Sequence, residues 1–285
     1  MRKQKADVLD LSCDREKKIF KGFSRGQLCI PYGLFIVLFV VFPLLLILFY
    51  AFTNQSGKFG FVNFIEFFSN PTSLSTLFVS LLIAGITTFF CLLLGYPIAY
   101  ILSKMNIRKS GILLLLFTAP MWINFVLRAM AMKEVMDLIG IFAKNDFYNF
   151  VNTIIGMTYD YLPFMIMPLY STLIKQDKSL LEASYDLGAT KTRTFVKITL
   201  PLSLPGIISG VTMVFLPSMS AYVISDTFGN GKITIIGKLI EQQFGTGANW
   251  NAGSAIAIVM LIIMFVTMFL TGSFNAEENA RGNAL

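Results

Sequence analysis

Residues 28–52 have the sequence LCIPYGLFIVLFVVFPLLLILFYAF, which is 25 residues without one charged side chain. A helix needs roughly 20 apolar residues to cross a hydrocarbon core about 30 Å thick. The charged segment before this run is 27 residues long, and no small-residue cleavage site follows it. The run is therefore predicted to be a retained membrane-spanning helix and not a cleaved signal peptide.

Five further stretches have similar length and apolarity. Of the 285 residues, 55% are hydrophobic and 14% are charged, and the mean hydropathy is +0.69. A soluble domain has about 25% charged residues, so this composition excludes a soluble enzyme, a disordered chain and a small disulfide scaffold. No barrel-type alternation of apolar and polar residues occurs, so an all-α polytopic protein is predicted. Its six expected spans are about 28–52, 74–103, 111–132, 152–174, 202–224 and 252–273.

The basic residues predict the orientation of these spans. Seventeen of the 23 Lys and Arg residues fall in the N-terminal segment, in the loops after spans two and four, and in the C-terminal tail. The alternate loops hold only five. The positive-inside rule then places both tails, 1–27 and 274–285, in the cytoplasm of a bacterial cell. Because topology explains the basic excess, nucleic-acid binding is not expected.

The sequence contains few of the residue types and motifs that catalysis or metal binding requires. Histidine is absent, and Cys13, Cys29 and Cys91 are too widely spaced to suggest a disulfide framework or a zinc site. Tyr159-Asp160 resembles half of an intramembrane aspartyl protease, but a second aspartate in a G-x-G-D setting is missing. An intramembrane enzyme and a passive channel remain as alternatives.

The loop at 175–201 has a helical pattern. Asp177 is expected to cap a first short helix, Gly188 to end it in a left-handed conformation, and Thr190 to cap a second one. Leu180, Ala183, Ser184 and Leu187 form one weakly apolar stripe. Two short helices bent at a glycine could contact a soluble partner or lie on the membrane surface, and periodicity alone does not choose between these.

The loop also contains a pattern of known spacing, formed by Glu182, Ala183, Ser184, Gly188, Ile198, Leu200 and Pro201. It resembles the E-A-A, x3, G, x9, I, x, L-P loop of ABC-transporter permeases, with Ser184 in place of the second alanine. The resemblance implies the type I (MetI-like) importer fold and a coupling helix that contacts an ATPase subunit. It also implies as partners two copies of that ATPase, a second similar permease and an extracellular binding protein.

The flanking segments resemble one branch of that family. Four segments are similar to permeases of spermidine/putrescine importers: LGYPIAYILSK (94–104), TAPMWINFVLRAMA (118–131), LPFMIMPLYSTLIKQDKSLLEASYDLGATK (162–191) and FLPSMSAYVISDTFG (215–229). This resemblance implies a polyamine substrate; importers of sulfate, iron or thiamine share the loop and remain the alternative. No G-x-x-x-x-G-K-[ST] motif occurs, so ATP and Mg are expected on the partner ATPase and no cofactor on this chain.

Polar and aromatic residues inside the spans are the candidates for a substrate pathway, because ionisable groups at membrane depth are costly. A polycation would be matched by carboxylates and aromatic faces. If span three is one helix, Trp122 lies near the midplane and Arg128 can reach the outer interface. Packing, anchoring or capping would explain several of these residues equally well. The candidates are Trp122, Asn124, Arg128, Asp160, Tyr222 and Asp226.

Overall fold

The computed structural model describes residues 25–54, 56–142, 145–247 and 249–282, with side chains described between 30 and 269. Most of the predicted N-terminal tail, 1–27, thus lies outside the described residues. The described part is helical apart from its connections and one isolated antiparallel bridge between Thr53 and Phe59. This agrees with the predicted all-α class.

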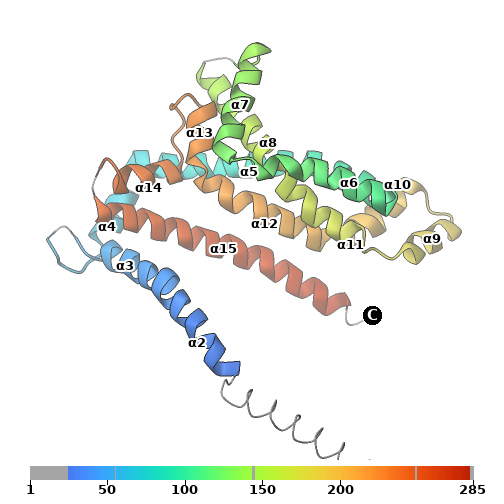
Figure 1. The fold of residues 1–285 in the computed structure, drawn as a ribbon, viewed down its shortest axis with the longest axis horizontal. Helices are drawn as coiled ribbons and strands as arrows, with labels where there is room; N and C mark the ends of the chain where they lie inside the picture. Colours follow the sequence, from blue (N-terminus) through green and yellow to red (C-terminus); the bar gives the residue numbers. More distant parts are fainter. Residues whose placement is uncertain (1–24, 55, 143–144, 248, 283–285) are drawn as a thin grey trace, which may run out of the picture.

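The elements follow one another along the whole described chain (Figure 1). They are α2 (Arg25–Ile36), η1 (Val37–Val41), α3 (Phe42–Ala51), α4 (Val62–Ser69), α5 (Pro71–Lys104), α6 (Ile107–Thr118), η2 (Ala119–Trp122), α7 (Phe125–Leu138), α8 (Asp146–Leu173), α9 (Lys178–Asp186), α10 (Lys191–Thr194), η3 (Phe195–Thr199), α11 (Leu200–Leu202), α12 (Leu204–Ser220), α13 (Tyr222–Phe228), α14 (Ile236–Phe244) and α15 (Trp250–Gly282).

Three long helices form the centre of the fold. Helices α5, α8 and α12 make the most extensive contacts with one another. Met165, Ile166 and Leu169 of α8 are fully buried there, together with Cys91 of α5 and Val214 of α12. Helix α15 lies beside α12 and α3, while α2 extends away from the body (Figure 1).

Two glycines bring α12 against α8. A Cβ on Gly206 would lie 2.7 Å from Thr172 Oγ1, and one on Gly210 would lie 2.6 Å from Met165 Sδ. Their spacing of four residues places both on one face of α12. Small residues at this spacing let two helix backbones approach closely, as in many membrane bundles. This assigns both glycines to helix packing.

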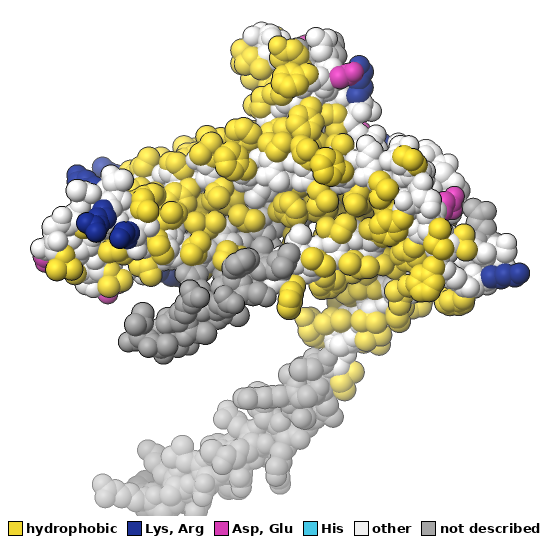
Figure 2. Space-filling view, turned by 180° about the vertical axis from the view of Figure 1, so that it is seen from behind, with side chains coloured by type: hydrophobic (Ala, Val, Ile, Leu, Met, Phe, Trp, Pro, Cys, Tyr) yellow, Lys and Arg dark blue, Asp and Glu magenta, His cyan; other side chains and the backbone are white. Residues whose placement is uncertain are grey.

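The outer surface is apolar over most of its length. Figure 2 shows hydrophobic side chains along the helical body, with most of the visible Lys and Arg side chains at its ends. Ile30–Ala51, Pro71–Lys104 and Trp250–Phe269 are long and apolar enough to cross a membrane. Counting each of two bent helix pairs as one span raises the number in the described residues to five. Helix α8, at the predicted fourth span, is not among them; it carries several polar residues that are buried against protein.

The predicted third span, 111–132, is not one helix. Ile107–Trp122 and Phe125–Leu138 are bent by 100° relative to each other. Pro120, which lacks an amide hydrogen, lies in the 3-10 turn just before the break, and Asn124 starts the new helix by accepting a hydrogen bond from the Val126 N–H at 2.9 Å. The straight helix from which the depths of Trp122 and Arg128 were inferred is therefore not present.

The predicted fifth span, 202–224, is also interrupted. Helix α12 ends at Ser220, and α13 begins at Tyr222 after a change of direction at Ala221. At the other end, the segments Lys191–Leu202 and Leu204–Ser220 are bent by 60°. The last predicted span, 252–273, is part of the longer helix α15, which continues to Gly282.

Candidate functional site

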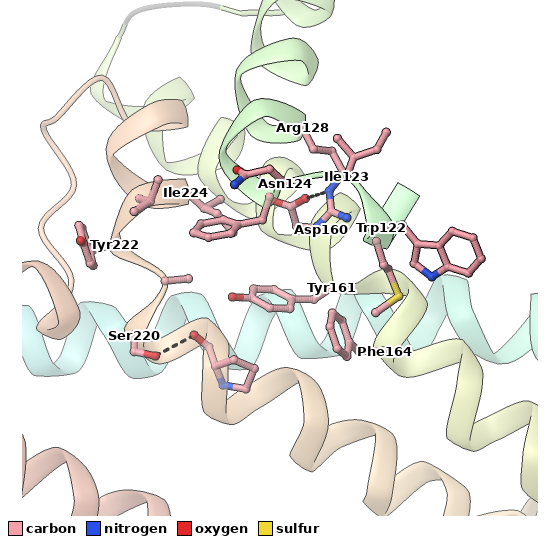
Figure 3. Close-up of a pocket in the computed structure, with 15 residues that line it drawn as sticks. Trp122, Ile123, Asn124, Arg128, Asp160, Tyr161, Phe164, Ser220, Tyr222 and Ile224 are labelled. Atoms are coloured by element: carbon pink, nitrogen blue, oxygen red, sulfur yellow. Dashed lines mark hydrogen bonds and ion pairs between the residues drawn. The ribbon is translucent and has the colours of Figure 1, made fainter. Parts of the chain in front are cut away.

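A cavity of about 600 Å³ lies where η2, α7, α8, α12 and α13 meet (Figure 3). The two breaks in the predicted spans create it, because each redirects a short helix and leaves space above α8. Five of the six sequence-predicted pathway residues line this cavity: Trp122, Asn124, Arg128, Asp160 and Tyr222. Residues far apart in the sequence are thus brought together at one place.

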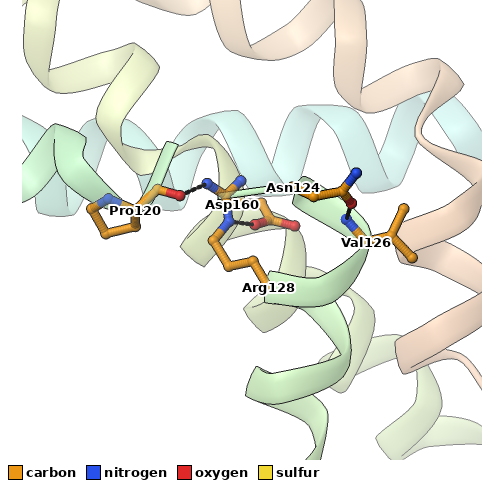
Figure 4. Close-up of polar contacts among 5 residues, drawn as sticks. All are labelled: Pro120, Asn124, Val126, Arg128 and Asp160. Atoms are coloured by element: carbon orange, nitrogen blue, oxygen red, sulfur yellow. Dashed lines mark hydrogen bonds and ion pairs between the residues drawn. The ribbon is translucent and has the colours of Figure 1, made fainter. Parts of the chain in front are cut away.

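Arg128 and Asp160 form a buried ion pair inside the cavity (Figure 4). Arg128 Nε donates to Asp160 Oδ1, and the two side chains are 9% and 2% exposed. Arg128 Nη1 also donates to the Pro120 carbonyl oxygen at 2.9 Å. The guanidinium therefore joins the break in span three to α8. This corrects the expectation that Arg128 extends to the outer interface.

Asp226 lies outside this cavity. Its carboxylate accepts a hydrogen bond from Lys238 Nζ at 2.7 Å, and the same ammonium lies 3.3 Å from Glu241 Oε2. The ring centroid of Tyr222 is 5.6 Å from that ammonium. Asp226 therefore belongs to a second polar group beside the cavity. Lys238 could not be predicted as the partner of Asp226, because the pair joins two helices separated by an irregular connection.

The aromatic residues of the site differ in exposure. The Trp122 side chain is 81% exposed, and its indole points away from Asp160 (Figure 3). Tyr161 and Phe164 of α8 line the cavity but were not predicted, since they are uncharged and the sequence does not distinguish them from the other aromatic residues of the spans. Asp160 is the one carboxylate among the described residues that line the cavity. The lining therefore offers no aspartyl pair of the kind that an intramembrane protease needs.

The loop with the E-A-A pattern lies at the far end of the body from α3, α4 and α14 (Figure 1). Its backbone follows the prediction: Asp177 accepts from the Ser179 N–H at 2.9 Å and caps α9, and Gly188 has φ +78°. The hydrogen bond from Ser179 holds the pKa of Asp177 below its ordinary value. Thr190 caps α10 through the Arg193 N–H. The expected helix, glycine turn and second helix are thus confirmed.

Ser184, the departure from the second alanine, is buried. Its hydroxyl lies 2.7 Å from Thr194 Oγ1, so a hydrogen bond joins α9 to α10. Phe195 then packs edge-on against Tyr96 and Tyr100 of α5. Side-chain contacts therefore link α9, through α10 and η3, to α5 at the centre of the bundle.

The outer side of α9 has no cover within the described residues. Glu182 and Ala183 are exposed, and Leu187 is 89% exposed. Ile198 and Leu200 are half-buried, whereas Pro201 is exposed. Five basic side chains of the same loop face outward as well: Lys175, Lys178, Lys191, Arg193 and Lys197. Of the expected apolar stripe, Ser184 is buried, whereas Leu180, Ala183 and Leu187 are exposed. The exposed surface of the loop therefore carries both apolar and basic side chains.

Comparison with known sequences identifies close relatives. The chain is 36% identical over 263 residues to the spermidine/putrescine transport system permease protein PotB of Haemophilus influenzae, covering 86% of this chain and 92% of that protein. It is 37% identical over 247 residues to the protein of the same name from Escherichia coli, covering 80% and 89%. The similarity thus extends over nearly the whole of both chains.

Solved structures show a similar fold at low sequence identity. A bacterial ABC transporter involved in the import of alginate matches with a TM-score of 0.70 and 15% identity over 93% of this chain and 99% of that one. The methionine ABC transporter MetNI matches with 0.56 and 18% over 72% and 95%. Residues 91–277 match the family model described as the inner membrane component of binding-protein-dependent transport systems. The chain belongs to this family and is an inner membrane component of such a transport system.

Proposed function

We propose that this chain is one permease subunit of an ATP-driven importer of polyamines, spermidine or putrescine. The proposed substrate rests on the match over 86% of the chain to a spermidine/putrescine permease. The cavity supports it, because a buried carboxylate and aromatic rings suit an alkylammonium ion. The cavity volume of about 600 Å³ also falls in the range of small-molecule sites.

The proposal includes the rest of the transporter. Membership of the family supports a second, similar permease, with which this chain would enclose a pathway that opens to alternate sides. Two ATPase subunits supply the energy, and ATP and Mg reside on them. The exposed side of α9, with Glu182 and Ala183, is the proposed contact with the ATPase. The chain itself is then a non-catalytic subunit that carries no cofactor.

Competition for uptake tests the substrate. The assembled complex with its binding protein would be reconstituted in proteoliposomes, and uptake of labelled spermidine would be measured against unlabelled putrescine, sulfate, ferric iron and thiamine. Competition by putrescine alone is expected. Uptake of sulfate, iron or thiamine in place of spermidine would assign the chain to another importer of the same family.

A further inference from the structure

The carboxylate of Asp160 is only half used by the protein. Oδ1 accepts from Arg128, whereas Oδ2 is buried and has no hydrogen-bond partner among the described residues. The side chain is 2% exposed and lines the cavity, and its second oxygen points away from Arg128 (Figure 4). A buried polar atom without a partner is costly, so such atoms are rare and call for an explanation.

Arg128 has enough other contacts to release Asp160. Its Nη1 donates to the Pro120 carbonyl, and its guanidinium carbon lies 5.9 Å from the ring centroid of Tyr159. A guanidinium released from the carboxylate would keep one hydrogen bond and one aromatic face. Asp160 has no such second partner, so it needs a cation from elsewhere whenever Arg128 moves away.

We propose that Asp160 binds an ammonium group of the transported cation, and that Arg128 is a tethered counter-ion which the substrate displaces. This proposal rests on the polyamine function above. A primary alkylammonium group has three donors and a secondary one has two, so either can donate to both carboxylate oxygens once Arg128 has moved away, while Tyr161 and Phe164 of the same cavity flank its alkyl chain. The ligand class is a primary or secondary alkylammonium ion.

The exchange gives the cavity a way to release its ligand. A cation bound to a buried, unopposed carboxylate would leave slowly, whereas conduction needs a site that binds weakly enough to let its ligand go. When Arg128 returns to Asp160, its guanidinium competes with the ammonium group of the ligand for the same carboxylate. Because Arg128 also contacts Pro120, its displacement would reach the break between α6 and α7.

Replacing both members of the ion pair by neutral residues separates a role in substrate binding from a purely structural role. The variants are Arg128→Gln, Asp160→Asn and the double variant, with Asp146→Asn as control, since Asp146 forms an exposed pair with Lys232. If the ion pair only stabilises the fold, each single variant leaves one buried charge unpaired and the double variant recovers. If Asp160 binds the substrate, the double variant stays defective although it is folded.

The measurement is equilibrium binding of labelled spermidine to the permease–ATPase complex in nanodiscs, without the binding protein. Arg128→Gln is expected to bind roughly tenfold more tightly than the wild type, and Asp160→Asn and the double variant more weakly, with the control unchanged. Wild-type affinity in the double variant would overturn the proposal, as would an assembled Arg128→Gln complex that binds no more tightly. Absence of binding to every variant of a complex that imports spermidine would also overturn it. A wild-type complex that imports no polyamine would instead contradict the proposed function.

Discussion

At the scale of single residues, protein cations pair with both carboxylates proposed for the substrate pathway. Arg128 pairs with Asp160 in the cavity, and Lys238 pairs with Asp226 beside it. The hydrogen bond to Asp226 raises the pKa of Lys238 above its ordinary value. The ion pair therefore contributes its full stability to the folded state below the ordinary lysine pKa, and this contribution is lost as the pH rises through the raised pKa. Lys238 is therefore an ammonium ion at physiological pH.

Asp226→Asn is expected to lower polycation uptake by several-fold while the complex still assembles. The change removes one charge at almost constant volume, and Lys238 keeps Glu241 at 3.3 Å. Because the pair is partly exposed, its loss should cost about 1 kcal/mol of stability or less. Uptake kinetics and gel filtration of the purified complex measure both effects. Unchanged kinetics would make Asp226 a purely structural residue.

At the scale of elements, the same kind of residue has different roles in different helices. Gly206 and Gly210 permit close packing of α12 on α8, whereas Gly85 of α5 has open space where a Cβ would be. Gly188 also has open space, but its φ of +78° is a left-handed conformation. Three substitutions of glycine therefore test three different physical effects.

Gly206→Val is expected to destabilise the bundle by roughly 1–3 kcal/mol or more, because its side chain would overlap Thr172 of α8. Gly85→Val is the matched control, since it adds the same side chain to a helix at an open position. Thermal unfolding of both variants in the same detergent measures the difference. Equal midpoints would show that α12 and α8 do not pack as described.

Gly188→Asp and Glu182→Lys are expected to leave the permease inserted and folded but to weaken its association with the ATPase. At Gly188 the cost within this chain is the left-handed backbone, about 1–2 kcal/mol for a residue with a Cβ. At Glu182 an exposed carboxylate that can accept charge-assisted hydrogen bonds is reversed in sign. Co-purified ATPase and its activity, with and without loaded binding protein, are the measurements. Normal association and stimulation in both variants would refute the coupling role of α9.

The sequence was most informative where local rules decide the structure. Asp177, Thr190 and Gly188 acted as caps and turn as predicted, because capping depends on neighbouring residues only. It was least informative at 119–124 and at Ala221. At 119–124 the local signals, Pro120 and the capping residue Asn124, lie inside a long apolar run that predicted one continuous helix, and Ala221 is an ordinary helix-forming residue. The partners of Arg128 and Asp226 could not be predicted, since both ion pairs join elements brought together only by those bends.

At the scale of the whole molecule, the exterior is largely apolar and most of the visible basic side chains lie at the ends of the helical body. The distribution of basic residues along the sequence predicts that both termini lie in the cytoplasm. This orientation predicts that a cysteine replacing Lys178 reacts with an impermeant thiol reagent only from the cytoplasmic side. A cysteine replacing Lys232 should react only from outside; both lysines are exposed. The background chain would carry serine at Cys13 and Cys29, and Cys91 is buried. Labelling of each cysteine from the opposite side would show that the orientation is the reverse of the predicted one.

ATP-driven accumulation of spermidine tests the central claim most directly. Proteoliposomes would contain this chain, the second permease and the ATPase, with loaded binding protein on one side and ATP on the other; matched vesicles would lack this chain. The account predicts that spermidine accumulates against its gradient only when both ATP and this chain are present. Accumulation without this chain, or ATP hydrolysis by the complete complex that moves no polyamine, would contradict it.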